Sequence, residues 1–469
     1  MTVTSHAPTG PAAMHTPDPH LVDTVLAYLR ERLLMPEAEL DGPAPPEQLA
    51  ATLDGLLTER GRPVEDVIEL FVHRIAPTVI SADSPRYLAF IPAAPTRASL
   101  VFDAVLSASS MSGVSWLEAA GAVAAENQVL RWIADLFGLP ASAGGTFVSG
   151  GSAGNLNGLA VARETARRRL GDPRARVRVA VGEEAHSSVA KALMLLDLEP
   201  LLVPTVDHRL TGEGLRAALV ADDADPAGGS ASGGPVVAVV ATAGTTNAGI
   251  VDDLAGVAAV AAERELWLHV DAAYGGAAVL SPTDGHRFAG IEYADSIVTD
   301  PHKWWFAPLD CAALLWRRPE LAQAIMTQDA SYLDVLHTDD TPVRNPSDLA
   351  YHLSRRARGL PLWFSLAVHG LGAYREAVQA AIDLANRTAQ RLAALPTVEL
   401  VRPPSLSVVL WRRLGWGPED YQRLQDELLT DQVALVTPTR WQGETVGRFS
   451  FLHPGTTDAM VDEVLQRLR

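Results

Sequence analysis

Two strand-like stretches decide the fold of this chain: residues 266–274, Leu-Trp-Leu-His-Val-Asp-Ala-Ala-Tyr, and residues 296–305, Ser-Ile-Val-Thr-Asp-Pro-His-Lys-Trp-Trp. Each begins as a short apolar run and ends in polar residues, with Asp271 in the first and Lys303 in the second. Nearly continuous apolar runs are typical of strands that are covered on both faces, and open α/β sheets bind ligands where such strands end. The two stretches therefore predict a buried sheet with an acid and an amine at one edge.

The same pattern continues on both sides of these stretches, from about Gly145 onward. Further apolar runs predict strands at residues 177–181, 200–203, 236–242 and 312–316. Stretches with helical character lie between several of the strands, at residues 156–170, 188–196 and 254–265. Strands that alternate with helices favour an α/β fold with a mostly parallel central sheet.

The flanking regions predict three further parts of the chain. Residues 1–18 mix Thr, Pro, His and Ala, which indicates a disordered tail. Apolar residues then recur at helical spacing, which predicts a helical N-terminal segment over residues 19–95. After a large domain over residues 96–363, helices mix with strands, which predicts a small α+β domain over residues 364–469.

Composition restricts the partners of the chain. The 38 Lys and Arg residues against 56 Asp and Glu residues leave a formal net charge of −18 among 469 residues. Nucleic acids and anionic membranes attract basic surfaces, so we expect neither as a partner. The single cysteine, Cys311, excludes an internal disulfide and a cysteine-rich zinc site, and we expect no metal. Because neither a membrane span nor a signal peptide is evident, we expect a cytoplasmic protein.

A glycine-rich turn supplies a candidate anion site. Residues 150–155 read Gly-Gly-Ser-Ala-Gly-Asn and precede a predicted helix, whose N-terminus favours a bound phosphate. The turn lacks the Lys-Ser/Thr pair of a nucleotide-binding P-loop. Considered singly, it could be only a tight turn, Asp271 could cap a helix, and Lys303 could be a solvated charge.

Together these features fit one cofactor. Pyridoxal phosphate (PLP) requires an amine, a carboxylate at its ring nitrogen and an anion site, which Lys303, Asp271 and the glycine-rich turn supply. The apolar surroundings of Lys303 are expected to lower its pKa and make it a better nucleophile. His186 offers an imidazole to stack on the ring, and Thr246 offers a hydroxyl, each after a predicted strand.

The chain resembles a known family over nearly its whole length after the tail. The motifs that carry the resemblance are residues 84–92 (Ser-Pro-Arg-Tyr-Leu-Ala-Phe-Ile-Pro), 147–155 (Phe-Val-Ser-Gly-Gly-Ser-Ala-Gly-Asn), 185–188 (Ala-His-Ser-Ser), 243–246 (Ala-Gly-Thr-Thr), 269–275 (His-Val-Asp-Ala-Ala-Tyr-Gly), 300–304 (Asp-Pro-His-Lys-Trp) and 354–358 (Ser-Arg-Arg-Ala-Arg). They are similar to those of the group II PLP-dependent amino-acid decarboxylases, which include aromatic-L-amino-acid and glutamate decarboxylases. The resemblance implies PLP fold type I, a PLP-binding large domain, and a homodimer formed partly by the N-terminal segment, with active sites at the interface.

The resemblance also implies roles for individual residues. Lys303 would form the Schiff base with the cofactor, and Asp271 would bind the ring nitrogen. Ala273 and His186 would pack on the two faces of the ring, and Thr246 would line the site. The residues expected around the phosphate are Ser152, Ala153, Gly154 and His302.

The implied reaction is decarboxylation of an L-amino acid to an amine and CO₂. Tyr332, in a short polar stretch that resembles the family's mobile catalytic loop, would protonate Cα, and His186 could take part in proton movement. A phenylalanine in place of this tyrosine would instead point to an aldehyde product.

The resemblance to the aromatic branch of the family also implies where the substrate binds. The residues that it implies for the pocket are Phe90, Pro92, Ala93, Val114 and Leu309. This pocket lacks an obvious base for a side-chain carboxylate and favours an aromatic or hydrophobic amino acid. An aldehyde synthase, a branched-chain or acidic substrate, and a cofactor-binding protein without turnover stay open. Arg448 is interpreted as structural, but a substrate-binding arginine at this place would favour an aminotransferase.

Overall fold

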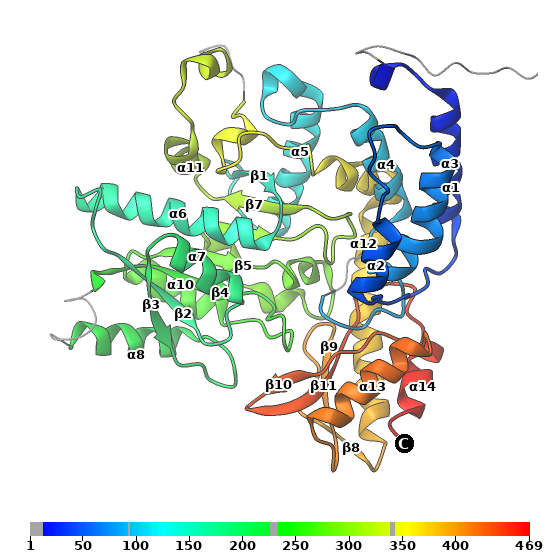
Figure 1. Ribbon diagram of the computed structural model, residues 1–469. Coiled ribbons are helices and arrows are strands. Elements are labelled where there is room, and N and C mark those ends of the chain that lie inside the picture. The colour runs from blue at the N-terminus through cyan, green and yellow to red at the C-terminus, as the bar shows by residue number, and fades with distance from the viewer. Residues whose placement is uncertain (1–12, 92–93, 226–232, 338–342) are drawn as a thin grey trace, which may run out of the picture. The chain divides into compact units, whose positions relative to one another are not determined.

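The computed structural model describes residues 13–91, 94–225, 233–337 and 343–469 (Figure 1). The contacts divide the chain into two units, Met1–Ser81 and Ala82–Arg469, which are described separately. The predicted domain boundaries at residues 95 and 363 stay predictions. Helix α12 (Leu360–Ala393) runs across the second of them.

Among its described residues, the first unit contains three α-helices, which lie within the helical N-terminal segment that the sequence predicts. They are α1 (Pro19–Leu34), α2 (Pro46–Leu53) and α3 (Val64–Leu70), and α3 continues as a π-helical turn over Phe71–Ile75. The Asp18 side chain caps α1 by accepting from the backbone N–H groups of His20 and Leu21. None of the three α-helices contains a buried residue, so their apolar side chains lack a core within this unit.

The second unit is built around a seven-stranded sheet. Its strands are β1 (Gly144–Val148), β2 (Arg178–Gly182), β3 (Glu199–Val203), β4 (Val236–Thr242), β5 (Trp267–Asp271), β6 (Ser296–Thr299) and β7 (Ala312–Trp316). The spatial order is β1-β7-β6-β5-β4-β2-β3. All neighbouring pairs are parallel except the two that involve β7, which confirms the predicted, mostly parallel α/β sheet.

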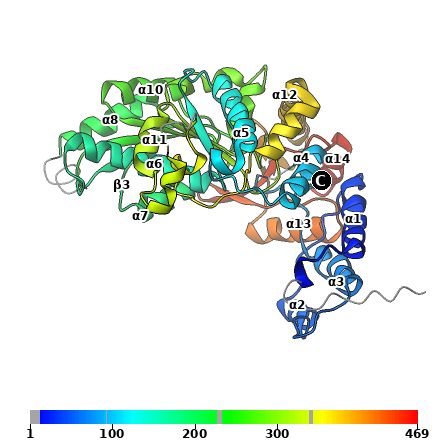
Figure 2. The same ribbon diagram turned by 90° about the horizontal axis from the view of Figure 1, so that it is seen from above.

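Helices cover both faces of this sheet (Figure 2). One face carries α6 (Gly151–Leu170), α7 (Ser187–Leu195) and α11 (Pro319–Met326), which share an apolar core with the sheet. The other carries α5 (Trp116–Leu136), α8 (Gly212–Asp223) and α10 (Leu254–Glu263). Because both faces are covered, the strands are apolar on both sides, as the sequence indicates.

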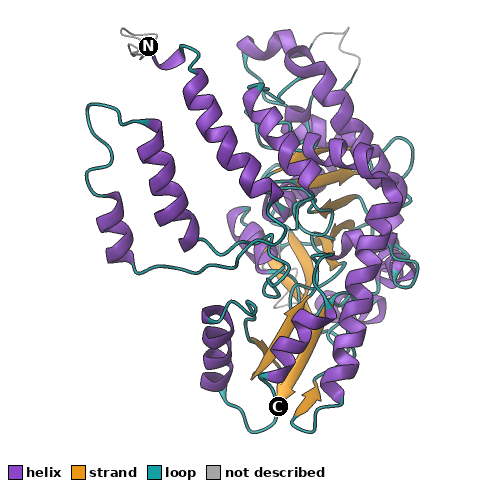
Figure 3. Ribbon diagram, turned by 90° about the vertical axis from the view of Figure 1, so that its right-hand side faces the viewer, coloured by secondary structure: helices purple, strands orange, loops and turns teal. Residues whose placement is uncertain are grey.

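A smaller antiparallel sheet follows in the C-terminal region (Figure 3). Its order is β10-β11-β9-β8, and it packs with helices into a separate apolar cluster. The remaining elements are α4 (Arg97–Ala108), α13 (Pro418–Thr430), α14 (Asp458–Gln466), β8 (Val398–Leu400), β9 (Val408–Arg413), β10 (Thr439–Trp441) and β11 (Glu444–Ser450).

Sequence patterns located most of these elements but missed some short ones. Strand β1 is not predicted, because two of its five residues are glycines. Helix α6 begins at Gly151 rather than at residue 156, so the glycine-rich stretch forms its first turns. Among the described helices, none combines the length and hydrophobicity needed to cross a lipid bilayer.

A buried ion pair connects α5 to the loop before α12. Glu126 and Arg355 have side chains that are 2% and 1% exposed, and they approach to 2.8 Å. The Glu126 carboxylate also accepts from the backbone N–H of Gly359 at 2.8 Å. Removing one partner of a buried pair leaves an uncompensated charge.

We therefore expect Glu126→Ala to lower the free energy of unfolding by about 3–5 kcal/mol, measured by urea denaturation. Glu263→Ala is the matched control, because Glu263 pairs with Arg216 at 2.8 Å on the surface. This control should leave the unfolding midpoint almost unchanged. Equal losses in the two variants would contradict the role assigned to the buried pair.

Candidate active site

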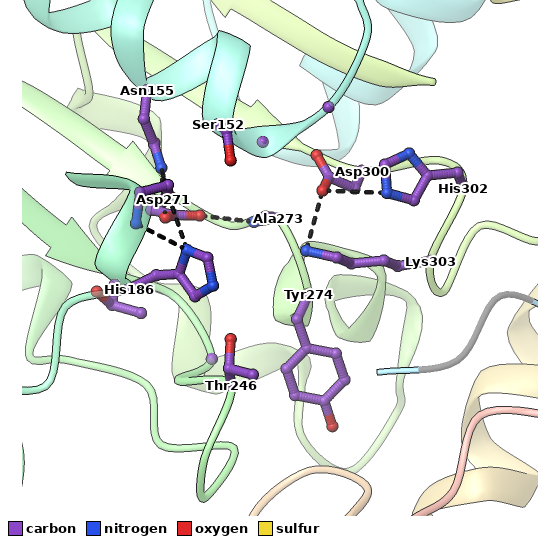
Figure 4. Close-up of a pocket in the computed structure, with 15 residues that line it drawn as sticks. Ser152, Asn155, His186, Thr246, Asp271, Ala273, Tyr274, Asp300, His302 and Lys303 are labelled. Carbon is purple, nitrogen blue, oxygen red and sulfur yellow. Dashed lines mark hydrogen bonds and ion pairs between the residues drawn. The ribbon is translucent and has the colours of Figure 1, made fainter. Parts of the chain in front are cut away.

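A cavity of about 180 Å³ lies at the carboxyl edge of the parallel strands (Figure 4). Segments that follow β1, β2, β4, β5 and β6 line it, and the sequence predicts all of these strands except β1. Its lining residues are Gly150, Gly151, Ser152, Asn155, His186, Ser188, Thr242, Gly244, Thr246, Asp271, Ala273, Tyr274, Asp300, His302 and Lys303.

Lys303 extends its amine into this cavity and forms an ion pair with Asp300 (Figure 4). Its Nζ lies 3.0 Å from Oδ2 of Asp300, a carboxylate that is 2% exposed. Burial lowers the pKa of Lys303, but the charge and hydrogen bond of Asp300, together with the charge of Asp271, outweigh burial and raise the pKa above its usual value. The prediction of a lowered lysine pKa was therefore wrong, because the negative charge of Asp300 lies next to the amine.

Asp271 ends β5 and is held by two donors. Its Oδ2 accepts from Nδ2 of Asn155 at 2.8 Å, and its Oδ1 accepts from the backbone N–H of Ala273 at 3.1 Å. The residue is 4% exposed, so these bonds restrict its orientation within the buried sheet edge. Asp271 and Lys303 share one cavity, as the PLP hypothesis requires.

His186 lies at the N-cap of α7. Its Nδ1 accepts from the backbone N–H of Ser188 at 3.2 Å and lies 2.8 Å from the Ser188 hydroxyl. The opposite side of the imidazole is free to face the cavity (Figure 4).

The first turn of α6 forms another part of the cavity wall. The first N–H groups of an α-helix have no partner within the helix, so they can bind an anion. A Cβ at Gly151 would lie 3.0 Å from both Cβ of Ala273 and Oδ2 of Asp300, so this position needs glycine. Ser152 lines the cavity, whereas Ala153 and Gly154 do not, and Gly154 packs against Val298.

His302 and Thr246 complete the predicted set. Nδ1 of His302 accepts from the backbone N–H of Cys311 at 3.1 Å, and its Nε2 lies 3.5 Å from Asp300. Burial lowers the pKa of His302. Thr246 lines the cavity, and its carbonyl accepts from Arg448.

The Arg448 guanidinium is occupied by backbone groups. It donates to the carbonyls of Thr246 at 2.6 Å, Phe90 at 2.7 Å and Asn247 at 3.1 Å. The residue is 4% exposed, and burial lowers its pKa to about 10. Arg448 does not line the cavity, which agrees with its structural interpretation.

The remaining predicted residues lie outside the cavity lining. Tyr332 is 71% exposed, and Phe90 and Leu309 are 59% and 63% exposed. Val114 is buried and packs against Leu333 and Leu336, which follow the predicted catalytic tyrosine, Tyr332, in the sequence. Pro92 and Ala93 lie outside the described residues. The roles of all these residues in substrate binding or catalysis stay predictions.

Several cavity residues were missed by sequence reasoning. Asn155, Ser188, Tyr274 and Asp300 all stand within motifs quoted above, but their types alone gave no role. The position of Asp300, directly after a strand and one helical turn before Lys303, is the signal that could have identified it.

The donor set of the cavity fits PLP. It offers one amine, one buried carboxylate with two donors, and a helix N-terminus for the phosphate. The amine is distinctive, because the whole chain contains only two lysines, Lys191 and Lys303. Lys191 is exposed on α7.

Comparisons with known proteins agree with this geometry. The model of the pyridoxal-dependent decarboxylase conserved domain matches residues 46–413. An aromatic-L-amino-acid decarboxylase from Bacillus atrophaeus is 29% identical, over 88% of this chain and 86% of the relative. A 3,4-dihydroxyphenylacetaldehyde synthase from Aedes aegypti is 28% identical, over 91% of this chain and 83% of the relative.

A solved structure extends the match to three dimensions. The crystal structure of Oryza sativa TDC with PLP and tryptamine superposes with a TM-score of 0.87 and 25% identity, and the match covers 99% of this chain and 98% of that one. The predicted fold type I and the predicted cofactor, PLP, are thereby confirmed. The chain belongs to the family of pyridoxal-dependent amino-acid decarboxylases.

Proposed function

We propose that this PLP-dependent enzyme converts an aromatic, or similarly hydrophobic, L-amino acid into its amine and CO₂. The observation that carries the proposal is the convergence of Lys303, Asp271 and the N-terminus of α6 on one cavity. When bound, PLP supplies an electron sink for the electron pair left at Cα when CO₂ departs.

Each of these groups has a separate task in the proposal. Lys303 provides the amine that holds the cofactor aldehyde, and the N-terminal turn of α6 with Ser152 binds the phosphate. Asp271 would accept a hydrogen bond from the protonated ring nitrogen, and its two protein donors restrict the orientation of its carboxylate. His186 packs on the ring, with its Nδ1 occupied by Ser188.

The position of Arg448 favours decarboxylation over transamination. An aminotransferase arginine needs a free guanidinium edge to bind the substrate carboxylate in a bidentate manner. In this chain three backbone carbonyls occupy that guanidinium. A carboxylate without such a clamp is more easily lost as CO₂, because the site gives its charge little stabilisation.

The cavity lining also supports the substrate class. Lys303, His186 and His302 are its basic residues, and no arginine belongs to the described lining. An acidic side chain would therefore lack a bidentate partner. Phe90, Val114 and Leu309 lie outside this lining and stay predicted pocket residues of apolar character.

We also propose that two copies of the chain form the active unit. Tyr332 is 71% exposed and does not line the cavity of its own chain, so a second copy is the source from which a catalytic tyrosine could reach it. Apolar residues of α1 support the same proposal, because Leu21, Val22 and Leu26 are all exposed. The cytoplasmic location stays a prediction.

Incubation of the PLP-loaded enzyme with a panel of L-amino acids tests the proposed reaction. We expect CO₂ and amine in equal amounts from aromatic substrates, and none from glutamate. Lys303→Ala should lose nearly all turnover, whereas Lys191→Ala, which removes the other lysine, should retain it. A keto acid without CO₂ would contradict decarboxylation, and an aldehyde with ammonia, peroxide and oxygen uptake would identify an aldehyde synthase.

Tyr332→Phe tests the proton donor. We expect the variant to bind PLP normally but to form less amine and more aldehyde, because the phenol that would protonate Cα is missing. Tyr293→Phe is the control, since Tyr293 is also exposed but does not line the cavity. Both products can be quantified by mass spectrometry. Unchanged amine output from Tyr332→Phe would remove this role.

Asp300→Asn tests the ion pair of the lysine. The amide removes the negative charge 3.0 Å from Nζ, so the pKa of Lys303 should fall. Since an amine reacts with an aldehyde only when unprotonated, PLP capture near neutral pH should become faster, and its pH midpoint should move to lower pH. Stopped-flow absorbance between about pH 6 and about pH 10 measures this shift.

Asp310→Asn provides the matched control for this pH shift. Asp310 follows in the same loop but pairs with Arg358 at 3.3 Å rather than with Lys303. Identical midpoints in the wild type and Asp300→Asn would show that Asp300 does not set the charge state of Lys303.

A further inference from the structure

A hydrogen-bond network of buried polar side chains leads from the cavity into the sheet. Nε1 of Trp267 donates to Oγ of Ser296 at 2.9 Å, and that oxygen lies 2.8 Å from Nδ1 of His269. Nε2 of His269 lies 2.9 Å from Oδ1 of Asn155, whose Nδ2 donates to Asp271 at 2.8 Å. All five residues are buried, and only Asn155 and Asp271 line the cavity.

The two ends of this hydrogen-bond network, together with a neutral His269, determine the direction of its bonds. The indole of Trp267 can only donate, and an ionised Asp271 can only accept. Asn155 must therefore turn its nitrogen toward Asp271 and its oxygen toward His269. Consequently Nε2 of His269 carries a proton, and in the neutral imidazole Nδ1 accepts from the Ser296 hydroxyl.

Burial supports this neutral form of His269. The side chain is fully enclosed, and loss of hydration lowers its pKa to about 4. Gly158 of α6 allows the ring to lie against the helix, because a Cβ there would be 2.5 Å from Cε1 of His269. The imidazole is thus neutral near neutral pH and confined to one place.

A branch of the same hydrogen-bond network reaches His186. Nδ2 of Asn155 also donates to Oγ of Ser188 at 2.9 Å, so the Ser188 hydroxyl is directed toward Nδ1 of His186, 2.8 Å away. The backbone N–H of Ser188 donates to the same Nδ1. With two donors at Nδ1, a neutral His186 must carry its proton on Nε2, on the side of the cavity.

We propose that Trp267, Ser296, His269 and Asn155 are positioning residues that set the hydrogen-bond direction at both Asp271 and His186. Through Asn155 they keep Asp271 an oriented acceptor and His186 a donor at Nε2. Naming the PLP ring as the group that Asp271 serves rests on the proposed function. The bond directions themselves do not.

The first experiment uses the full-length protein with ¹⁵N-labelled histidine, without PLP and then with PLP. Correlations between ring nitrogens and ring protons distinguish the two neutral tautomers and the imidazolium. Near neutral pH we expect the Nε2–H tautomer at both His269 and His186, with assignments from His269→Gln and His186→Gln. A proton on Nδ1 of either residue, or a charged His269, would overturn the proposal.

The second experiment removes one hydrogen bond of this network at a distance from the cavity. Ser296→Ala removes the donor to His269, and we expect about tenfold weaker PLP binding and an altered absorption spectrum of bound PLP. Ser365→Ala is matched, because Ser365 is fully buried and bonds Thr96 and Tyr374 outside this chain of residues. Equal PLP affinities and spectra in the two variants would contradict the proposal.

A pair of variants at His269 provides a rescue test. His269→Gln retains an N–H for Asn155 and should bind PLP nearly as tightly as the wild type, whereas His269→Leu should bind about tenfold more weakly. Similar losses of PLP affinity in both variants would show that the shape of the His269 ring, and not its N–H group, determines PLP binding. If the wild type binds no PLP, the proposed function fails, but the tautomers in the PLP-free protein still decide this inference.

Discussion

The in-register ending of three parallel strands is the constraint on which the site depends. Asp271, the last residue of β5, pairs with Thr242 at the end of β4 and with Val298 near the end of β6. Parallel strands bring their carboxyl ends to one edge, so the loops that follow must share the space beyond it. Helices cover both faces of the sheet, and residues far apart in the chain meet beyond its edge.

The same sheet edge brings two carboxylates and one amine into the cavity. Two buried carboxylates, Asp271 and Asp300, lie in a cavity with one amine. Asp300 pairs with the amine, while Asp271 accepts from uncharged donors. The two acids therefore have separate environments. Asp271 is left available to bind the cofactor ring, while Asp300 pairs with Lys303.

The fold and the central pair of site residues could be predicted from the sequence, because they depend on local patterns. Apolar runs ending at Asp271 and near Lys303 indicate both the strands and their functional ends. The pKa of Lys303 could not be predicted, because its sign depends on how the chain turns after Asp300. The roles of Asn155 and Ser188 depend on side chains more than thirty residues away. Short strands such as β8 and β10 depend on pairing rather than on their own residues.

The scarcity of lysine has a consequence for how the protein meets reactive carbonyl compounds. Of the 38 basic residues counted as Lys or Arg, 36 are arginines. A guanidinium stays protonated at physiological pH and therefore has little tendency to condense with aldehydes. Free vitamin B6 aldehyde, or an aldehyde by-product, thus encounters Lys191 as the single competing side-chain amine. Simple aldehydes, which form Schiff bases with amines, therefore find few side-chain targets on this chain besides the active-site lysine.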